Sequence, residues 1–133
     1  MTISNKNIGN KFEKYTAEYL SENGFWVYRL PNKIGGQPFD ILALKNDIII
    51  ALDCKVCSND VFNKSRIEDN QHTAMNKMLK CASKAKVGFY FLFNDGTKCF
   101  ASYNDIVKAD KGNLKKDDLM MIGGKLLAES KNL

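Results

Sequence analysis

The chain has 133 residues, of which 44% are hydrophobic, and a formal net charge of +5. This length and composition predict one domain, residues 1–133, that is large enough to bury a real core. The sequence has neither a signal peptide nor an apolar run of about 18 residues, so we expect a cytoplasmic protein with no membrane partner. In that compartment the four cysteines are expected to be reduced and partly buried.

The positive charge is unevenly distributed along the chain. Residues 1–53 carry six basic and six acidic side chains, whereas residues 54–98 carry eight basic and four acidic ones. A basic excess of this kind favours a polyanion as partner, because lysine and arginine gain most from neutralising closely spaced phosphates. A soluble basic protein with a solvated charged face is the alternative interpretation.

Periodicity and turn residues predict an α/β fold, a mixed β-sheet flanked by helices. The first half should contain a helix at 10–23 that ends at Gly24, a strand at 25–30, a flexible loop at 31–37, and two strands that meet at Asn46–Asp47. An irregular polar connection at 58–68, a helix at 69–84, a hairpin at 87–102 and a short helix at 103–107 should follow. From about residue 108 a basic C-terminal tail is expected to pack peripherally and fray.

Two acids flank the first predicted hairpin. If Asn46–Asp47 forms a two-residue turn, Lys45 pairs with Ile48, and the same register places Asp40 directly opposite Asp53. Directly opposed side chains have Cβ atoms only about 4.5 to 5.5 Å apart. Two carboxylates at that spacing repel by about 4 kcal/mol at an effective dielectric constant near 20. They therefore need a proton or a cation between them, and a divalent metal fits best.

A lysine accompanies the second acid. Lys55 lies two residues after Asp53, so on a strand both side chains project from the same face. An acid and a lysine side by side suit a metal ion and a phosphate. Cys54 and Cys57 have the spacing of a zinc or redox pair, but strand alternation puts them on opposite faces and no second pair completes a four-ligand site.

Two polar residues are expected on the packing faces of the helices. Glu13 falls at the edge of the apolar face of the first helix, where a carboxylate needs a partner. An ordinary boundary glutamate is the alternative. Gln71 projects from the apolar stripe of the helix at 69–84, which points it back at the sheet near Asp53.

The motif Pro38-Phe39-Asp40 followed by Asp53-Cys54-Lys55 resembles the PD-(D/E)XK nuclease superfamily, with one residue inserted between proline and aspartate. Helix-opening segments at 9–13 and 66–72 extend the resemblance to RecU-like Holliday-junction resolvases, over roughly residues 9 to 107. The resemblance implies a restriction-endonuclease-like core. It also implies a catalytic set formed by a helix glutamate, two strand acids, a lysine and a downstream glutamine, which here are Glu13, Asp40, Asp53, Lys55 and Gln71.

The same resemblance implies a metal-dependent DNA endonuclease that cuts four-way junctions symmetrically, in the cytoplasm of a bacterium or a phage-infected host. Oxygen ligands suit Mg²⁺ or Mn²⁺, and the expected ligands are Asp40, Asp53, Glu13 and the backbone carbonyl of Cys54. The expected DNA contacts are Lys33, Lys64, Arg66 and His72. For His72, a role in capping the core is an equal alternative.

A homodimer with two-fold symmetry would match the near two-fold symmetry of the junction, with the strand at 25–30 and the first helix as its expected interface. The chain departs from the bacterial resolvases in the short segment before Asp40, where they carry a long projection. A repair or restriction-type nuclease is therefore the alternative within the superfamily. From another class, the alternative is a catalytically silent DNA-binding module.

Overall fold

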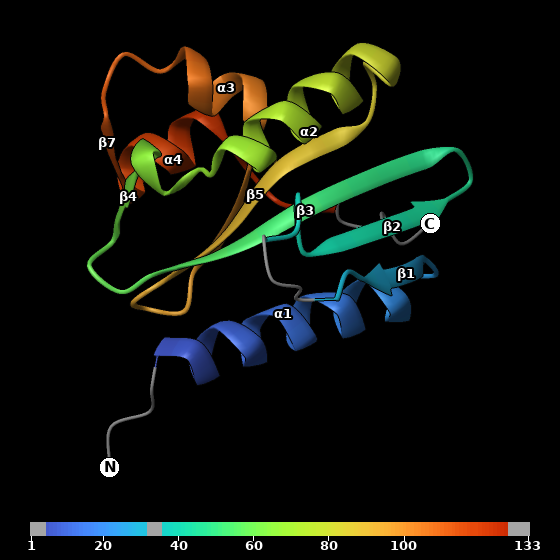
Figure 1. The fold of residues 1–133 in the computed structure, drawn as a ribbon. Helices are drawn as coiled ribbons and strands as arrows, with labels where there is room; N and C mark the ends of the chain where they lie inside the picture. The colour runs from blue at the N-terminus through green and yellow to red at the C-terminus, as the bar shows by residue number, and fades with distance from the viewer. Residues whose placement is uncertain (1–4, 32–35, 128–133) are drawn as a thin grey trace, which may run out of the picture.

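The computed structural model describes residues 5–31 and 36–127. Its main feature is a five-stranded mixed sheet in the order β1-β2-β3-β5-β6, built from Trp26–Arg29, Ile41–Lys45, Ile48–Cys57, Lys86–Phe93 and Lys98–Ser102. Helix α1, Asn5–Glu22, covers one face, whereas α2, Asp69–Cys81, and α3, Tyr103–Lys108, lie over the other (Figure 1). The predicted α/β fold with a mixed sheet flanked by helices is confirmed.

The hairpin of β2 and β3 has the predicted register. Asn46 and Asp47 form its turn with φ angles of 46° and 68°, the left-handed pair that a two-residue hairpin of matching twist requires. Lys45 is paired with Ile48, and the ladder runs back to Ile41 and Leu52. Beyond β2 the Asp40 amide donates to the Leu52 carbonyl at 2.8 Å, although Leu52 is already the partner of Ile41. The register therefore slips by one residue at the end of β2, as at a β-bulge, so the prediction that Asp40 lies directly opposite Asp53 is wrong in register, and Asp40 lies beside the Leu52–Cys54 stretch instead.

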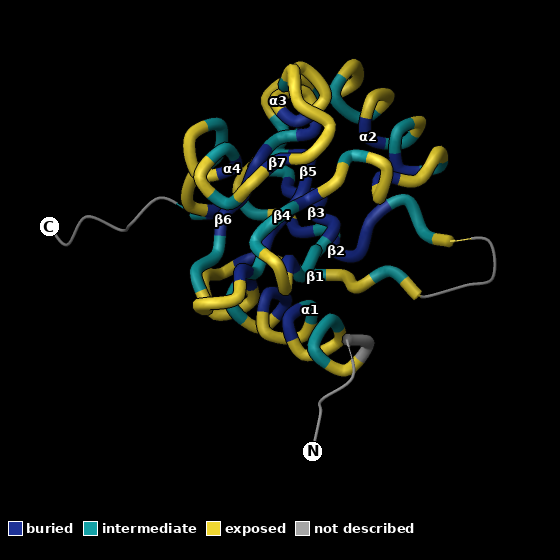
Figure 2. Tube along the Cα trace, turned by 90° about the vertical axis from the view of Figure 1, so that its left-hand side faces the viewer, coloured by how far each residue is buried: buried dark blue, intermediate teal, exposed yellow. Residues whose placement is uncertain are grey.

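Residues of β3 alternate between two apolar cores, one on each face of the sheet. The core under α1 contains Ile50 and Leu52, and the core under α2 contains Ala51 and Cys57. Figure 2 shows these buried strands between α1 on one side and α2 and α3 on the other. Cys54 packs against the α1 core and Cys57 is buried in the α2 core, as the alternation predicted, and the four cysteines are free thiols.

The C-terminal segment differs from its prediction. Strand β7, Asn113–Lys115, pairs with β4, Val61–Asn63, and α4, Lys116–Ile122, follows it. Apolar residues of this segment complete both cores, and Leu114, Leu119 and Leu126 are at most 2% exposed. The expectation of a peripheral tail from about residue 108 is therefore wrong for residues 113–126, because each apolar island pairs or packs with a distant element.

Other boundaries also move, and α1 begins at Asn5, five residues before the predicted start at 10. The connection at 58–68 contains β4 and a short 3-10 helix, Lys64–Arg66, and α2 ends at Cys81, three residues before the predicted end at 84. None of the helices in the described residues is long and apolar enough to cross a membrane.

Candidate active site

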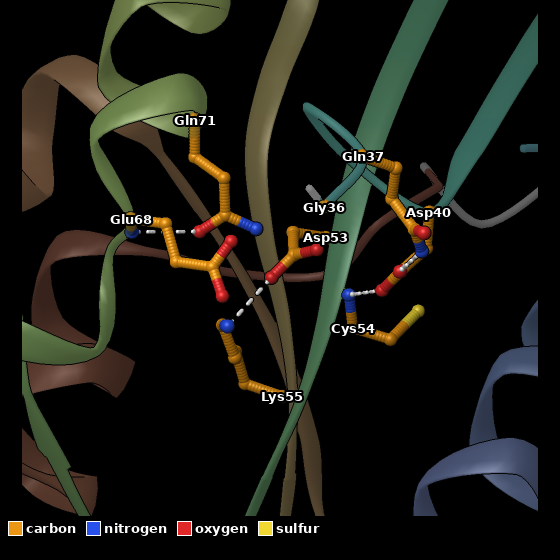
Figure 3. A pocket seen from close by; sticks show the side chains of 8 residues that line it. All are labelled: Gly36, Gln37, Asp40, Asp53, Cys54, Lys55, Glu68 and Gln71. Atoms are coloured by element: carbon orange, nitrogen blue, oxygen red, sulfur yellow. Dashed lines mark hydrogen bonds and ion pairs between the residues drawn. The ribbon is translucent and has the colours of Figure 1, made fainter. Parts of the chain in front are cut away.

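A cleft of about 200 Å³ opens beside the middle of β3. Three parts of the chain contribute to it: β3, the segment just before β2, and the start of α2 (Figure 3). The residues that line it are Gly36, Gln37, Asp40, Asp53, Cys54, Lys55, Glu68 and Gln71. The structure thus brings together four of the five predicted catalytic residues, although they come from three separate segments.

Asp40 is buried and held by two donors. Its Oδ2 accepts from the Cys54 amide at 2.7 Å, and its Oδ1 accepts from Gln37 Nε2 at 2.7 Å. The first of these bonds depends on the β2–β3 hairpin, which brings the middle of β3 alongside the acid. Each oxygen keeps a lone pair, so the carboxylate is oriented without being saturated.

Asp53 is only 3% exposed, and its charge is incompletely balanced. Burial, followed by the charge of Asp40, raises the pKa of Asp53 to about 7, and the Lys55 ammonium opposes that rise. Asp53 Oδ2 lies 2.9 Å from Lys55 Nζ, yet it lacks a well-aligned hydrogen bond among the described residues. This oxygen is a buried acceptor in need of a further positive partner.

Gln71 is fixed by the start of its own helix. Its Oε1 accepts from the backbone amide of Glu68 at 3.1 Å, which satisfies one of the free donors of the first turn of α2. The amide nitrogen is then left to face Asp53, as Figure 3 shows. Gln71 therefore presents a hydrogen-bond donor, and not an acceptor, to the cleft.

Glu13, the fifth predicted residue, lies beside the cleft and does not line it. It borders a neighbouring hollow together with Arg29 and Gln37. Its Oε1 accepts from Arg29 Nε at 3.2 Å. Burial and then the charge of Asp40 raise the pKa of Glu13, so the two carboxylates lie within electrostatic reach of each other.

Two of the residues predicted to contact DNA make internal contacts. Lys64 Nζ donates to the carbonyls of Val107 and Ala109 at the C-terminal end of α3, where a cation complements the free carbonyl groups. His72 Nδ1 lies 2.7 Å from the Tyr103 hydroxyl, which joins α2 to α3. These contacts give both side chains a structural role, and their DNA contacts stay predictions.

The other two predicted DNA contacts differ in position. Arg66 is exposed, donates to the Val56 carbonyl at 3.3 Å and borders a hollow that also reaches Lys55. This hollow adjoins the cleft, because Cys54 and Lys55 line both. Lys33 lies outside the described residues.

Sequence reasoning missed Arg29, Gln37 and Glu68. Arg29 ends an exposed edge strand, and nothing in the sequence indicates that it pairs with Glu13, which is 16 residues earlier in the chain. Gln37 and Glu68 precede a strand and a helix, and no periodicity marks them. The nearby Gly36 did carry a signal, because a glycine in a loop before a predicted site can mark a close approach of the backbone. The structure has such an approach: the φ of Gly36 is +81°, and an added Cβ would lie 3.2 Å from Glu68 Oε2 and from Asn70 Nδ2.

The donors at the cleft fit a hard divalent cation. They are the two buried carboxylates of Asp40 and Asp53, of which Asp53 Oδ2 has only the Lys55 ammonium beside it among the described residues, and backbone carbonyl oxygens. Within the described part of the chain, no three His, Cys, Asp or Glu side chains cluster in a way that could hold a metal. The fit therefore depends on Asp40 and Asp53 supplemented by neutral oxygens, such as the Cys54 carbonyl.

Comparison with known proteins supports this interpretation. Residues 4–128 match the family model for the archaeal Holliday junction resolvase, Hjc. A UPF0102 protein from Dictyoglomus turgidum is 34% identical over 80 residues, which are 60% of this chain and 67% of that protein. The fold is similar to that of Hjc from Archaeoglobus fulgidus, with a TM-score of 0.66 and 15% identity over 88% of this chain and 95% of that one.

The family match confirms the predicted resemblance to PD-(D/E)XK nucleases and the prediction of a Holliday-junction-resolving endonuclease. Hjc-type resolvases are metal-dependent, in agreement with the donor set of the cleft. With its mixed sheet and its acid-acid-lysine cleft, the chain belongs to the archaeal Holliday junction resolvase family.

Proposed function

We propose that Asp40 and Asp53 hold a Mg²⁺ or Mn²⁺ ion with which this endonuclease hydrolyses a phosphodiester bond of a four-way DNA junction. The observation that carries the proposal is the pair of buried carboxylates beside which the described residues place one ammonium, that of Lys55. Like charges so close are tolerated when a cation lies between them. The Cys54 carbonyl is the proposed third ligand.

A bound divalent cation supplies a Lewis acid for the phosphate and lowers the pKa of a water molecule. Asp40 is already oriented by its two donors, so its position needs no rearrangement before the reaction. Lys55 offsets the negative charge that develops on the phosphate oxygens. The free amide nitrogen of Gln71 donates to the scissile phosphate or to the attacking water.

Glu13 acts from the adjacent hollow, either on a second cation or on a water molecule, and Arg29 holds its side chain in place. Arg66 is proposed to bind a phosphate beside the scissile one, because it is exposed next to Lys55. Replacement of a phosphate contact should weaken binding similarly for all sequences and reduce its salt dependence. A cytoplasmic location suits a DNA substrate and stays a prediction.

A homodimer is proposed through the exposed face of β1. Trp26 and Tyr28 are 58% and 47% exposed, and their rings stack with centroids 6.2 Å apart. Leu44, directly opposite Trp26 on β2, is 39% exposed on the same face. Exposed aromatic side chains that lie together on an edge strand are typical of interfaces.

Sedimentation at micromolar concentration tests the dimer. Trp26→Ser should shift the protein toward monomer, whereas Tyr15→Ser, at an exposed site on α1, should leave the oligomeric state unchanged. If Tyr15→Ser alone yields monomers, the interface lies on α1. A wild-type monomer, both free and bound to a junction, contradicts the dimer and favours a nuclease that makes single nicks.

The function itself is tested with end-labelled four-way, forked and linear DNA of the same sequence, incubated with Mg²⁺, Mn²⁺ or EDTA. We expect paired symmetric nicks in the four-way junction, cleavage with either metal and none in EDTA. Equal cleavage of linear duplex would favour a repair or restriction-type nuclease. Cleavage in EDTA would contradict the metal site.

A further inference from the structure

Gln37 connects the cleft with the hollow that contains Glu13. It lines both spaces, and its side chain lies against Asp40, as Figure 3 shows. Its Nε2 donates to Asp40 Oδ1 at 2.7 Å, a short bond of the kind that carboxylates form with amide donors. Asp40 is thus held at both oxygens, by the Gln37 side chain at Oδ1 and by the Cys54 backbone amide at Oδ2.

The chemistry of Asp40 fixes the orientation of the Gln37 amide. A carboxylate only accepts hydrogen bonds, so the nitrogen of the amide must face it and the amide oxygen must face away. The oxygen, Oε1, is buried and has no hydrogen-bond partner among the described residues. A buried acceptor without a partner is unfavourable, so a water molecule that enters with a ligand and donates to this oxygen would be stabilised here.

The backbone around Gln37 is anchored to α2, so the side chain starts from a fixed position. Asn70 Nδ2 donates to the Gln37 carbonyl at 3.0 Å. The preceding residue, Gly36, approaches Glu68 and Asn70 so closely that a side chain there would contact both. Because α2 also carries Gln71, one helix start positions residues on two sides of the cleft.

We propose that Gln37 is a further positioning residue of the metal centre: its Nε2 orients Asp40, and its Oε1 accepts a hydrogen bond from a water molecule that enters with the divalent cation. The inference rests on the proposed function, since it assumes that Asp40 binds the cation. Hydrogen-bonded partners of ligating carboxylates commonly change metal affinity about 10- to 100-fold when they are replaced.

The test is Mn²⁺ binding to the full chain without DNA, followed by calorimetry or by the electron paramagnetic resonance signal of free Mn²⁺. Gln37→Met keeps the length of the side chain but removes both polar atoms. We expect its Mn²⁺ dissociation constant to rise about 10- to 100-fold. Asn76→Met, on the exposed side of α2, is the matched control and should bind as the wild type does.

Gln37→Glu is the second variant, and it separates positioning from packing. It places a carboxylate beside Asp40, so we expect the melting temperature in EDTA to fall and the rise produced by Mn²⁺ to be larger than in the wild type. A packing role alone would lower the melting temperature of both Gln37 variants without any change in Mn²⁺ affinity.

The proposal is overturned if Gln37→Met binds Mn²⁺ as tightly as the wild type does. It is also overturned if Gln37→Glu melts at the same temperature as the wild type both in EDTA and in Mn²⁺. A wild-type protein that binds no Mn²⁺ would instead overturn the metal centre itself. The two failures are therefore distinguishable.

Discussion

The two faces of β3 use the same stretch of strand for different purposes. On the α1 face, Leu52 and Val56 pack with Ile50 in an apolar core. On the α2 face, Asp53 and Lys55 alternate with these residues and open into a polar cleft. Because strand side chains alternate every residue, the apolar face anchors the backbone whose other face presents the charged groups.

The contrast shows how a buried charge pair can be maintained without collapse of the fold. Asp53 and Lys55 are nearly enclosed, an arrangement that by itself stabilises little because both charges lose hydration. The stability must then come from the apolar side of the strand and from the core beyond the cleft. Substitutions on the two faces of β3 should accordingly separate activity from stability.

The largest effect is expected for Asp53→Asn. The substitution removes a proposed metal ligand, and we expect junction cleavage to fall by about 1,000-fold or more, in line with the loss of a main electrostatic contributor. Junction binding should be unchanged or tighter, because a negative charge near the phosphates is lost. Cleavage of labelled junctions in Mg²⁺ and gel shifts in EDTA measure the two quantities. If Asp53→Asn cleaves the junction in Mg²⁺ at the rate of the wild type, the assignment of Asp53 as a metal ligand is refuted.

The opposite result is expected for Leu52→Ala on the apolar face. Leu52 is fully buried, so the cavity should lower the free energy of unfolding by about 2 to 5 kcal/mol. Urea unfolding measures this loss. Leu52 does not line the cleft, so at low temperature the folded fraction should cleave within about 10-fold of the wild-type rate. This corresponds to a change of about 1.4 kcal/mol or less in the activation barrier. A larger loss of activity would show that the two faces are coupled.

The pH dependence of stability sharpens the comparison. The pKa of Asp53 is raised from 3.8 to about 7, so between these values the folded protein retains a proton that the unfolded chain has released. In EDTA, this group therefore makes stability fall as pH rises from about 4 to about 7. Unfolding of wild type and Asp53→Asn by urea at stepped pH should diverge over that window, and a constant difference would contradict the raised pKa.

The smallest effect is expected for Cys54→Ala. The thiol packs toward the α1 core, while the backbone of the same residue donates to Asp40 and carries the proposed carbonyl ligand. Loss of the sulfur should cost about 1 kcal/mol of stability, and cleavage should be close to that of the wild type. A strong loss of cleavage that Cys54→Ser restores would instead indicate a role for the side chain.

The sequence by itself determined which strands bring the two acids together. Asn46–Asp47 allows a left-handed two-residue turn, and this turn sets the register from Lys45–Ile48 to Ile41–Leu52, so that Asp40 and Asp53 follow at the same end of the ladder. It also predicted the side of β3 that carries Lys55. These features depend on contacts within about fifteen residues of the chain, where turn chemistry and periodicity leave few alternatives.

Tertiary structure alone decided the surroundings of that pair. The pairing of Glu13 with Arg29, the position of Gln37 against Asp40 and Asn70, and the burial of residues 113–126 each join segments that are separate in the chain or connected by irregular backbone. Local periodicity carries no information about such contacts, because loop geometry and packing between elements set them. For the same reason the basic residue Lys64 pairs with backbone carbonyls of α3, a contact that its charge alone could not predict.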